Sequence, residues 1–94
     1  MPWRIGFDPR ALRSLAKLDH PVQDSIVAYL EERVIAPQDP RMFGEALKGP
    51  KLRDFWRYKV GDYRIVVEIR DWILLVYVID VGNRKEIYKR MRGR

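Results

Sequence analysis

Hydrophobic and polar positions alternate at the start of the chain and then change to a helical spacing. Apolar side chains take every second position over Trp3–Phe7, which is typical of a half-buried strand. Asp8 followed by Pro9 fits a helix N-cap with proline in the first turn. The next apolar residues predict a short helix that ends near Leu18: Ala11, Leu12, Leu15 and Ala16.

A second amphipathic segment begins after the turn that Asp19 and His20 form before Pro21. Its apolar residues keep to one helical stripe: Val22, Ile26, Tyr29, Leu30 and Val34. We therefore predict a second helix that packs on an apolar surface. Residues 36–50 hold three prolines and two glycines, so we expect a connector in which residues 41–48 could form a turn of helix.

The apolar period changes to two in the second half of the chain. Three strands are expected in a meander: Phe55–Val60, Tyr63–Arg70 and Trp72–Val81. Turns at Gly61-Asp62 and at Asp71 connect them. The last strand is apolar on both faces, which is typical of a central strand covered on each side. Residues 86–88 could add a short final strand before a basic tail.

The order of the expected elements predicts the α+β class. One domain over residues 1–94 would hold a strand, two helices and then three strands, with the short final strand left open. We expect a twisted, mainly antiparallel sheet with both N-terminal helices packed on one face. The opposite face of the sheet would then be free for function.

The positive charge lies in one half of the chain. The net charge is +6, but residues 1–47 contain 6 Lys and Arg against 7 Asp and Glu, and residues 48–94 contain 13 against 6. Such an asymmetry favours a polyanionic partner such as RNA, DNA or a ribosome, with a solubilising surface charge as the alternative.

Several kinds of chemistry are excluded by what the chain lacks. Without cysteine there is no disulfide framework, thiolate nucleophile or cysteine-containing zinc motif. His20 is the only histidine, which excludes a two-histidine ribonuclease mechanism. No carboxylate set predicts a metal site, and Asp80 is read as a strand-end residue. The longest apolar run, Trp72–Ile79, is too short to span a bilayer, and with no export signal we expect a cytoplasmic protein that does not enter membranes.

Three cations of the central hairpin are the candidate functional residues. Alternation puts Arg57 and Lys59 on one face of their strand, and pairing around Gly61-Asp62 brings Arg64 close to Lys59. Clustered like charges cost free energy unless an anion relieves them, which is typical of a phosphate site. Alternatively, the three side chains extend into solvent or pair with nearby carboxylates: Asp54, Asp62 and Glu68.

Two stretches, LKGPKLRDFWRYKVGDYRIVVEI and LLVYVIDVGNRKEIY, closely resemble the RelE branch of the RelE/ParE toxins of bacterial toxin–antitoxin systems. The resemblance extends over nearly the whole chain, and GDYRIVVEI and VGNRKEIY are its most specific parts. It implies the RelE-like fold and a ribosome-dependent endoribonuclease that needs no metal or cofactor. Such an enzyme cuts mRNA in the A site of the 70S ribosome and is silenced by a cognate RelB-like antitoxin in a hetero-oligomer.

The resemblance assigns roles to the hairpin cations. Arg57 and Lys59 take the positions of two basic strand residues that contact the RNA phosphate, and Lys59 is the candidate general base. Some relatives have lysine in place of Arg57, so Arg57 is expected to clamp phosphate and not to accept a proton. Arg64 would hold the phosphate oxygens as charge builds in the transition state.

The C-terminal motif supplies the remaining candidates. Arg84 is expected to assist the leaving 5′-oxygen, and Lys85 beside it to contact phosphate. Tyr88 would stack on or orient the flanking nucleotide. The RelB-like antitoxin could bind apolar surface beside the two N-terminal helices or displace the basic tail, residues 90–94, and so disturb Tyr88.

Two other functions remain open from the sequence. A ParE-like toxin would share the fold but inhibit DNA gyrase through protein contacts, without a catalytic site. A non-enzymatic RNA- or ribosome-binding module would also explain the basic second half. The cations and Tyr88 together favour the endoribonuclease over both.

Overall fold

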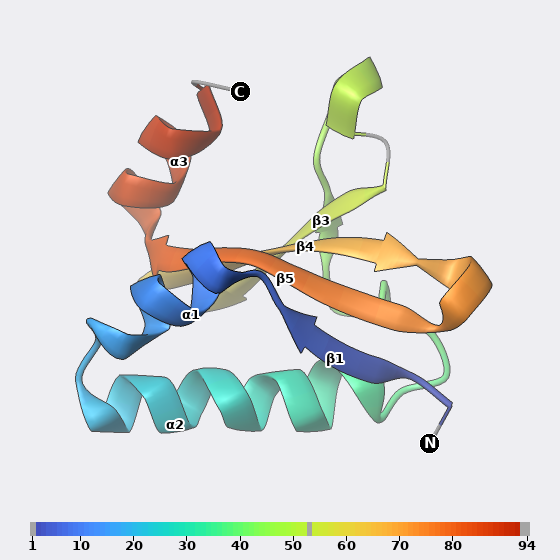
Figure 1. Cartoon of the computed structure of the whole chain (residues 1–94), viewed down its shortest axis with the longest axis horizontal. Helices are drawn as coiled ribbons and strands as arrows, with labels where there is room; N and C mark the ends of the chain where they lie inside the picture. Colours follow the sequence, from blue (N-terminus) through green and yellow to red (C-terminus); the bar gives the residue numbers. More distant parts are fainter. Residues whose placement is uncertain (1, 53, 93–94) are drawn as a thin grey trace.

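The structure, a computed structural model, describes residues 2–52 and 54–92. Within them, a first strand is followed by two helices, four strands and a last helix, which is an α+β arrangement (Figure 1). The strands are β1 (Arg4–Phe7), β2 (Glu45–Ala46), β3 (Phe55–Val60), β4 (Tyr63–Arg70) and β5 (Leu75–Asn83). The helices are α1 (Pro9–Ala16), α2 (His20–Tyr29) and α3 (Arg84–Arg92), with a π-helical segment at Leu30–Ile35 and 3-10 segments at Pro50–Leu52 and Asp71–Ile73.

The five strands form one mixed sheet in the order β1-β5-β4-β3-β2. β1 runs parallel to β5, and the other neighbouring strands are antiparallel. This confirms the predicted α+β class and the mainly antiparallel sheet. β5 is an interior strand, paired with β1 on one side and β4 on the other, which explains why it is apolar on both faces. The strand begins at Leu75, three residues later than expected, because Asp71–Ile73 form the 3-10 turn.

The two N-terminal helices form where the sequence predicts them. The carboxylate of Asp8 caps α1 by accepting a hydrogen bond of 2.9 Å from the backbone N–H of Arg10. α1 ends at Ala16, two residues before the expected Leu18. Both helices contribute to one core under the sheet, which includes Ala11, Ile26, Leu30, Val34, Tyr58, Ile65, Val67 and Val78. No helix in the described part of the chain is long and apolar enough to cross a membrane.

The connector forms a strand and not the helical turn expected over residues 41–48. Glu45 pairs with Arg57, so that β2 adds a short edge to the sheet beside β3. Gly44 directs the chain over the buried ring of Tyr58, where an added Cβ would lie only 2.8 Å from a ring carbon. Backbone pairing with β3 and this close approach favour an extended chain over a helical turn.

The prediction of a final strand over residues 86–88 is wrong, because these residues belong to α3. The side chain of Asn83 accepts a hydrogen bond of 2.9 Å from the N–H of Glu86 and donates one of 2.6 Å to its carboxylate. Ile87 is buried, which gives the helix an apolar contact with the sheet. Figure 1 shows α3 on the side of the sheet opposite α2, so that face is partly covered.

The strand register determines which side chains share the α3 face. Lys59 lies directly opposite Arg64, and Arg57 lies opposite Val66. Residues opposite each other in an antiparallel pair point to the same face, so the cations share the α3 face, as the sequence predicts. A bulge leaves Ile79 unpaired on β5 and puts Asp80 opposite Val66 on this face.

Candidate functional site

The α3 face of the sheet brings five of the predicted site residues together. Arg57 and Lys59 come from β3, Arg64 from β4, and α3 places Tyr88 above them. Arg84, from the first turn of α3, completes the group. We call these five residues the cationic site. The β3-β4 hairpin carries both apolar and cationic residues because one of its faces belongs to the core and the other forms this site.

Three arginines of the site, Arg57, Arg64 and Arg84, converge on Tyr88. Nη1 of Arg57 donates a hydrogen bond of 3.1 Å to the phenol oxygen. The guanidinium carbons of Arg57 and Arg84 lie 5.5 Å and 5.6 Å from the centre of the ring, close enough for cation–π attraction. Burial acts to raise the pKa of Tyr88, but Arg57, Arg64 and Arg84 outweigh it and hold the pKa below its ordinary value.

Arg64 is fixed more firmly than the other cations. The residue is 7% exposed, and Nη1 donates hydrogen bonds of 2.9 Å to the carbonyl oxygens of Gly61 and Tyr63. Among the described residues, Nε of Arg64 and Nε of Arg57 are buried and have no acceptor. Buried donors without partners are costly, so two of them on one cationic face indicate a place for an anion.

Glu45 belongs to the same site, although it was not predicted as a site residue. Its carboxylate lies 3.1 Å from Nζ of Lys59 and 3.4 Å from Nη2 of Arg57. The hydrogen bond to Lys59, followed by the charges of Lys59 and Arg57, lowers the pKa of Glu45. A strand of two residues has no periodicity, so only the pairing of β2 with β3 reveals the contact.

The carboxylates that the sequence offered as partners behave differently. Glu68 pairs with Arg70, at 2.6 Å, and not with the cationic site. Within residues 2–52 and 54–92, neither Asp54 nor Asp62 forms an ion pair with the cations. The charge on Lys59 and Arg57 is thus balanced by one exposed carboxylate, and no carboxylate of the described residues forms an ion pair with Arg64, whose Nη1 donates to backbone carbonyls.

Lys85 lies beside the cationic site and not within it. Its side chain is exposed and lines a surface hollow of about 490 Å³ with Asp62, Asn83, Arg84 and Glu86. Arg84 therefore links the hollow to the cationic site. His20 is exposed at the first residue of α2. In the described part of the chain, no three acidic or histidine side chains gather closely enough to hold a metal ion.

A family model, a curated protein sequence and solved structures all match this chain to toxins of type II toxin–antitoxin systems. Residues 5–88 match the family described as ParE toxin of type II toxin-antitoxin system, parDE. The mRNA interferase toxin RelE of Escherichia coli K12 is 32% identical over 92 residues, which cover 94% of this chain and 92% of that protein. The likeness thus extends over nearly the whole of both chains.

Solved structures are similar over most of their length. The isolated E. coli RelE toxin has a TM-score of 0.70 at 28% identity, with 98% of this chain and 97% of that chain covered. E. coli RelE bound to a peptide of the antitoxin RelB has a TM-score of 0.73 at 28% identity, covering 97% and 95%. The RelBE2 complex of Mycobacterium tuberculosis reaches 0.77 at 24% identity, covering 88% and 92%, and supports the fold alone.

Proposed function

The chain belongs to the ParE toxin family of type II toxin–antitoxin systems, and we propose that it acts as a RelE-type mRNA interferase, a ribosome-dependent endoribonuclease. The observation that carries the proposal is the convergence of Arg57, Arg64 and Arg84 on Tyr88. An inhibitor that acts by protein contact needs no such convergence, nor the buried Nε atoms of Arg57 and Arg64 that have no acceptor among the described residues. The identity to an mRNA interferase supports the same choice.

The proposed reaction is cleavage of the RNA backbone by its own 2′-hydroxyl. The 2′-oxygen bonds to the adjacent phosphorus as the bond to the 5′-oxygen breaks, leaving a 2′,3′-cyclic phosphate and a 5′-hydroxyl. One proton leaves the 2′-hydroxyl and one reaches the 5′-oxygen. Arg57 and Arg64 would hold the non-bridging oxygens, because their unpartnered Nε atoms can donate to the charge that builds there.

The remaining roles follow from the positions of the other residues. Lys59 is proposed as the general base, which requires its pair with Glu45 to open when RNA binds. Arg84 is proposed to assist the leaving 5′-oxygen, with Lys85 contacting phosphate at the edge. Tyr88 would stack on or orient a nucleotide, held by the hydrogen bond from Arg57. No step requires a metal or an organic cofactor.

The proposed partners are a programmed 70S ribosome and a cognate RelB-like antitoxin in a cytoplasmic hetero-oligomer. E. coli RelE has been solved with an antitoxin peptide, which supports such a partner here. Leu12 of α1 and Val27 of α2 are exposed and offer apolar surface to an amphipathic helix. Of the basic tail, Gly93 and Arg94 lie outside the described residues, whereas Arg90 belongs to α3.

Primer extension on programmed ribosomes tests the proposed function. The purified chain is expected to cut mRNA within the A-site codon, and Arg84→Ala to reduce cutting about a hundredfold, because a donor to developing charge is lost. Arg13→Ala removes an exposed arginine of α1 and should cut normally. Intact mRNA with a folded chain would contradict the proposal. Inhibition of gyrase supercoiling would then favour a ParE-type toxin that acts on gyrase.

Glu45→Gln should strengthen RNA binding. The carboxylate occupies the donors of Lys59 and Arg57 that a phosphate would use, so its neutralisation removes a competing anion. We expect binding of a short single-stranded RNA at low salt to tighten about threefold, the scale of one exposed ion pair. Glu32→Gln, on the exposed side of the π-helical segment, is the matched control. Unchanged affinity with much slower cleavage would instead assign Glu45 a part in the proton transfer.

A further inference from the structure

A buried carboxylate connects three elements close to the cationic site. Asp80 of β5 is fully buried, contrary to its reading as a strand-end residue, because the bulge on β5 turns it toward α3. β1 pairs with β5 only as far as Val78, and α1 packs along the rest of that edge. Ser14 of α1 donates a hydrogen bond of 3.0 Å to the Asp80 carboxylate. Asp80 therefore has no access to water and depends on protein partners.

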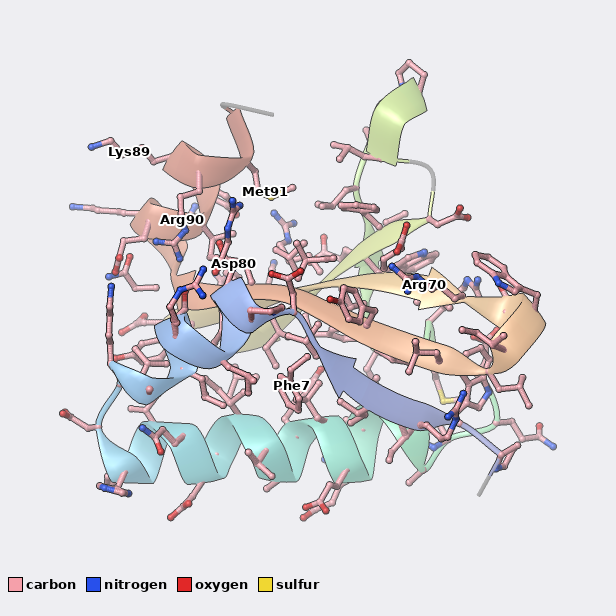
Figure 2. All side chains as sticks on the ribbon, viewed as in Figure 1. Phe7, Arg70, Asp80, Lys89, Arg90 and Met91 are labelled. Carbon is pink, nitrogen blue, oxygen red and sulfur yellow. The ribbon has the colours of Figure 1, made fainter. Side chains whose placement is uncertain are left out.

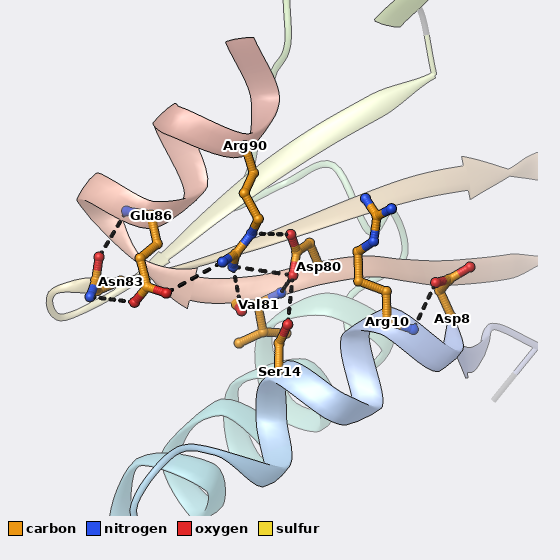
Figure 3. A network of polar contacts seen from close by, with 8 residues as sticks. All are labelled: Asp8, Arg10, Ser14, Asp80, Val81, Asn83, Glu86 and Arg90. Carbon is orange, nitrogen blue, oxygen red and sulfur yellow. Dashed lines mark hydrogen bonds and ion pairs between the residues drawn. The ribbon is translucent and has the colours of Figure 1, made fainter. Parts of the chain in front are cut away.

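The principal partner of Asp80 is Arg90 of α3. Nε and Nη2 of Arg90 lie 2.7 Å and 3.3 Å from the two carboxylate oxygens, in a two-point contact. Nη2 also donates to the carbonyl of Val81 at 3.2 Å, and Nη1 to Glu86 at 3.3 Å. Figure 3 shows this network between β5, α1 and α3. We call the group of Ser14, Asp80 and Arg90 the latch.

Gly82 makes room for the latch. A Cβ at this position would lie 2.6 Å from Nη2 of Arg90, so a larger residue would push the guanidinium away. This gives a physical reason for the glycine in VGNRKEIY, a motif that the proposed reaction uses only through Arg84, Lys85 and Tyr88. Gly82 also lies directly opposite Arg64 in the sheet, which puts the latch and the cationic site side by side.

We propose that Asp80 and Arg90 are positioning residues that fix α3 on the sheet, so that Tyr88 and Arg84 reach the cationic site. α3 follows β5 without a loop, and the register of Tyr88 above Arg57 therefore depends on how the helix is tilted. Among the residues of the helix whose burial is described, Ile87 and Arg90 of the latch hold it to the buried part of the sheet. Ile87 is apolar and tolerates a range of tilts, whereas the two-point contact of Arg90 with Asp80 sets one orientation.

The inference rests on the proposed function for its effect on cleavage, but the placement of Tyr88 can be measured without RNA. Tyr88 has a lowered pKa only while it lies among the cations. Burial raises the pKa of the other tyrosines with altered titration, namely Tyr29, Tyr58 and Tyr77. An absorbance titration of phenolate should thus show an early phase in the parent chain, and Tyr88→Phe should remove it.

Two variants open the latch in different ways. Asp80→Asn removes the charge that holds Arg90, and Gly82→Ala displaces the guanidinium without removing any charge. In both we expect the early phase to move up toward pH 10, the ordinary tyrosine value. Lys89→Gln is the matched control. Lys89 lies on the same helix as Arg90, and Figure 2 shows its side chain pointing away from Asp80. It should leave the early phase in place.

Far-ultraviolet circular dichroism establishes whether each variant is folded. If Asp80→Asn does not fold, Gly82→Ala alone tests the latch. An early phase that stays unmoved in the folded variants would overturn the latch. On programmed ribosomes the variants should lower kcat about tenfold to a hundredfold with little change in KM, as expected for a misplaced group. A shifted titration with parental kcat would overturn the positioning role. If the parent chain does not cut mRNA, the proposed function fails, and the titration still tests the latch.

Discussion

We expect Arg64→Lys to cleave A-site mRNA about a hundredfold to a thousandfold more slowly than the parent chain, the loss typical of a donor to developing charge. Nη1 of Arg64 donates to the carbonyls of Gly61 and Tyr63, which holds the guanidinium in one orientation. Nε is buried, has no acceptor among the residues that the structure describes, and is available to the phosphate. A lysine has one nitrogen, so it cannot serve the turn and the phosphate in this geometry.

Single-turnover cleavage in programmed ribosomes, followed by primer extension, measures the loss. Arg13→Lys, an exposed substitution on α1, is the matched control and should cleave like the parent chain. Thermal unfolding of Arg64→Lys separates lost catalysis from lost fold, because its backbone contacts also support the hairpin turn. If Arg64→Lys cleaves at a rate within about threefold of the parent chain, the loss is far smaller than expected and Arg64 has no part in the proposed reaction.

The face of the hairpin cations could be predicted because strand periodicity is a local property. Once Gly61-Asp62 is taken as the turn, alternation alone places Arg57 and Lys59 on the face of Arg64. The same holds for the cap of α1 at Asp8, where a side chain bonds the backbone two residues away. Contacts between residues that are close in the sequence can therefore be predicted from the sequence pattern.

The partners of these residues could not be predicted, because they come from distant segments. Glu45 reaches Lys59 only because β2 pairs with β3, and two residues of strand give no periodic signal. Asp80 is turned toward Arg90 by a bulge, which shifts the face of every later residue on β5. The sequence around Asp80 does not indicate whether its carboxylate forms a buried ion pair or lies on the surface.

The end of the chain shows how a local pattern can be misread. Over residues 86–88, a strand and a helix are both compatible with a single apolar residue, Ile87. The helix forms because Asn83 and Glu86 cap it reciprocally and because Ile87 and Arg90 both face the sheet. The helical spacing then puts Arg84 beside Tyr88, with its guanidinium carbon 5.6 Å from the centre of the ring. In a strand the two residues would also share a face, but their backbones would lie about 13 Å apart.

Tyr58→Ala is expected to lower the free energy of unfolding by about 3–5 kcal/mol, the usual loss for a large buried aromatic residue. The side chain is fully buried, and its ring lies 6.0 Å from that of Tyr29 at 59°. Its hydroxyl donates a hydrogen bond of 2.6 Å to the carbonyl of Pro40. Tyr58→Phe should cost about 1–3 kcal/mol, because it leaves this carbonyl without its donor. Urea unfolding at neutral pH measures both.

The same residue makes stability depend on alkaline pH. Burial raises the pKa of Tyr58 far above its ordinary value of 10.0. The unfolded chain releases this proton near pH 10, whereas the folded chain keeps it, so the stabilisation is complete below pH 10 and is lost as the pH rises further. Tyr58→Phe has no proton to lose there and should show a flatter decline. Tyr63→Phe, at the partly exposed end of the hairpin, is the control and should follow the parent chain. Parallel declines in the parent and in Tyr58→Phe would show that Tyr58 ionises in the folded chain as freely as in the unfolded one.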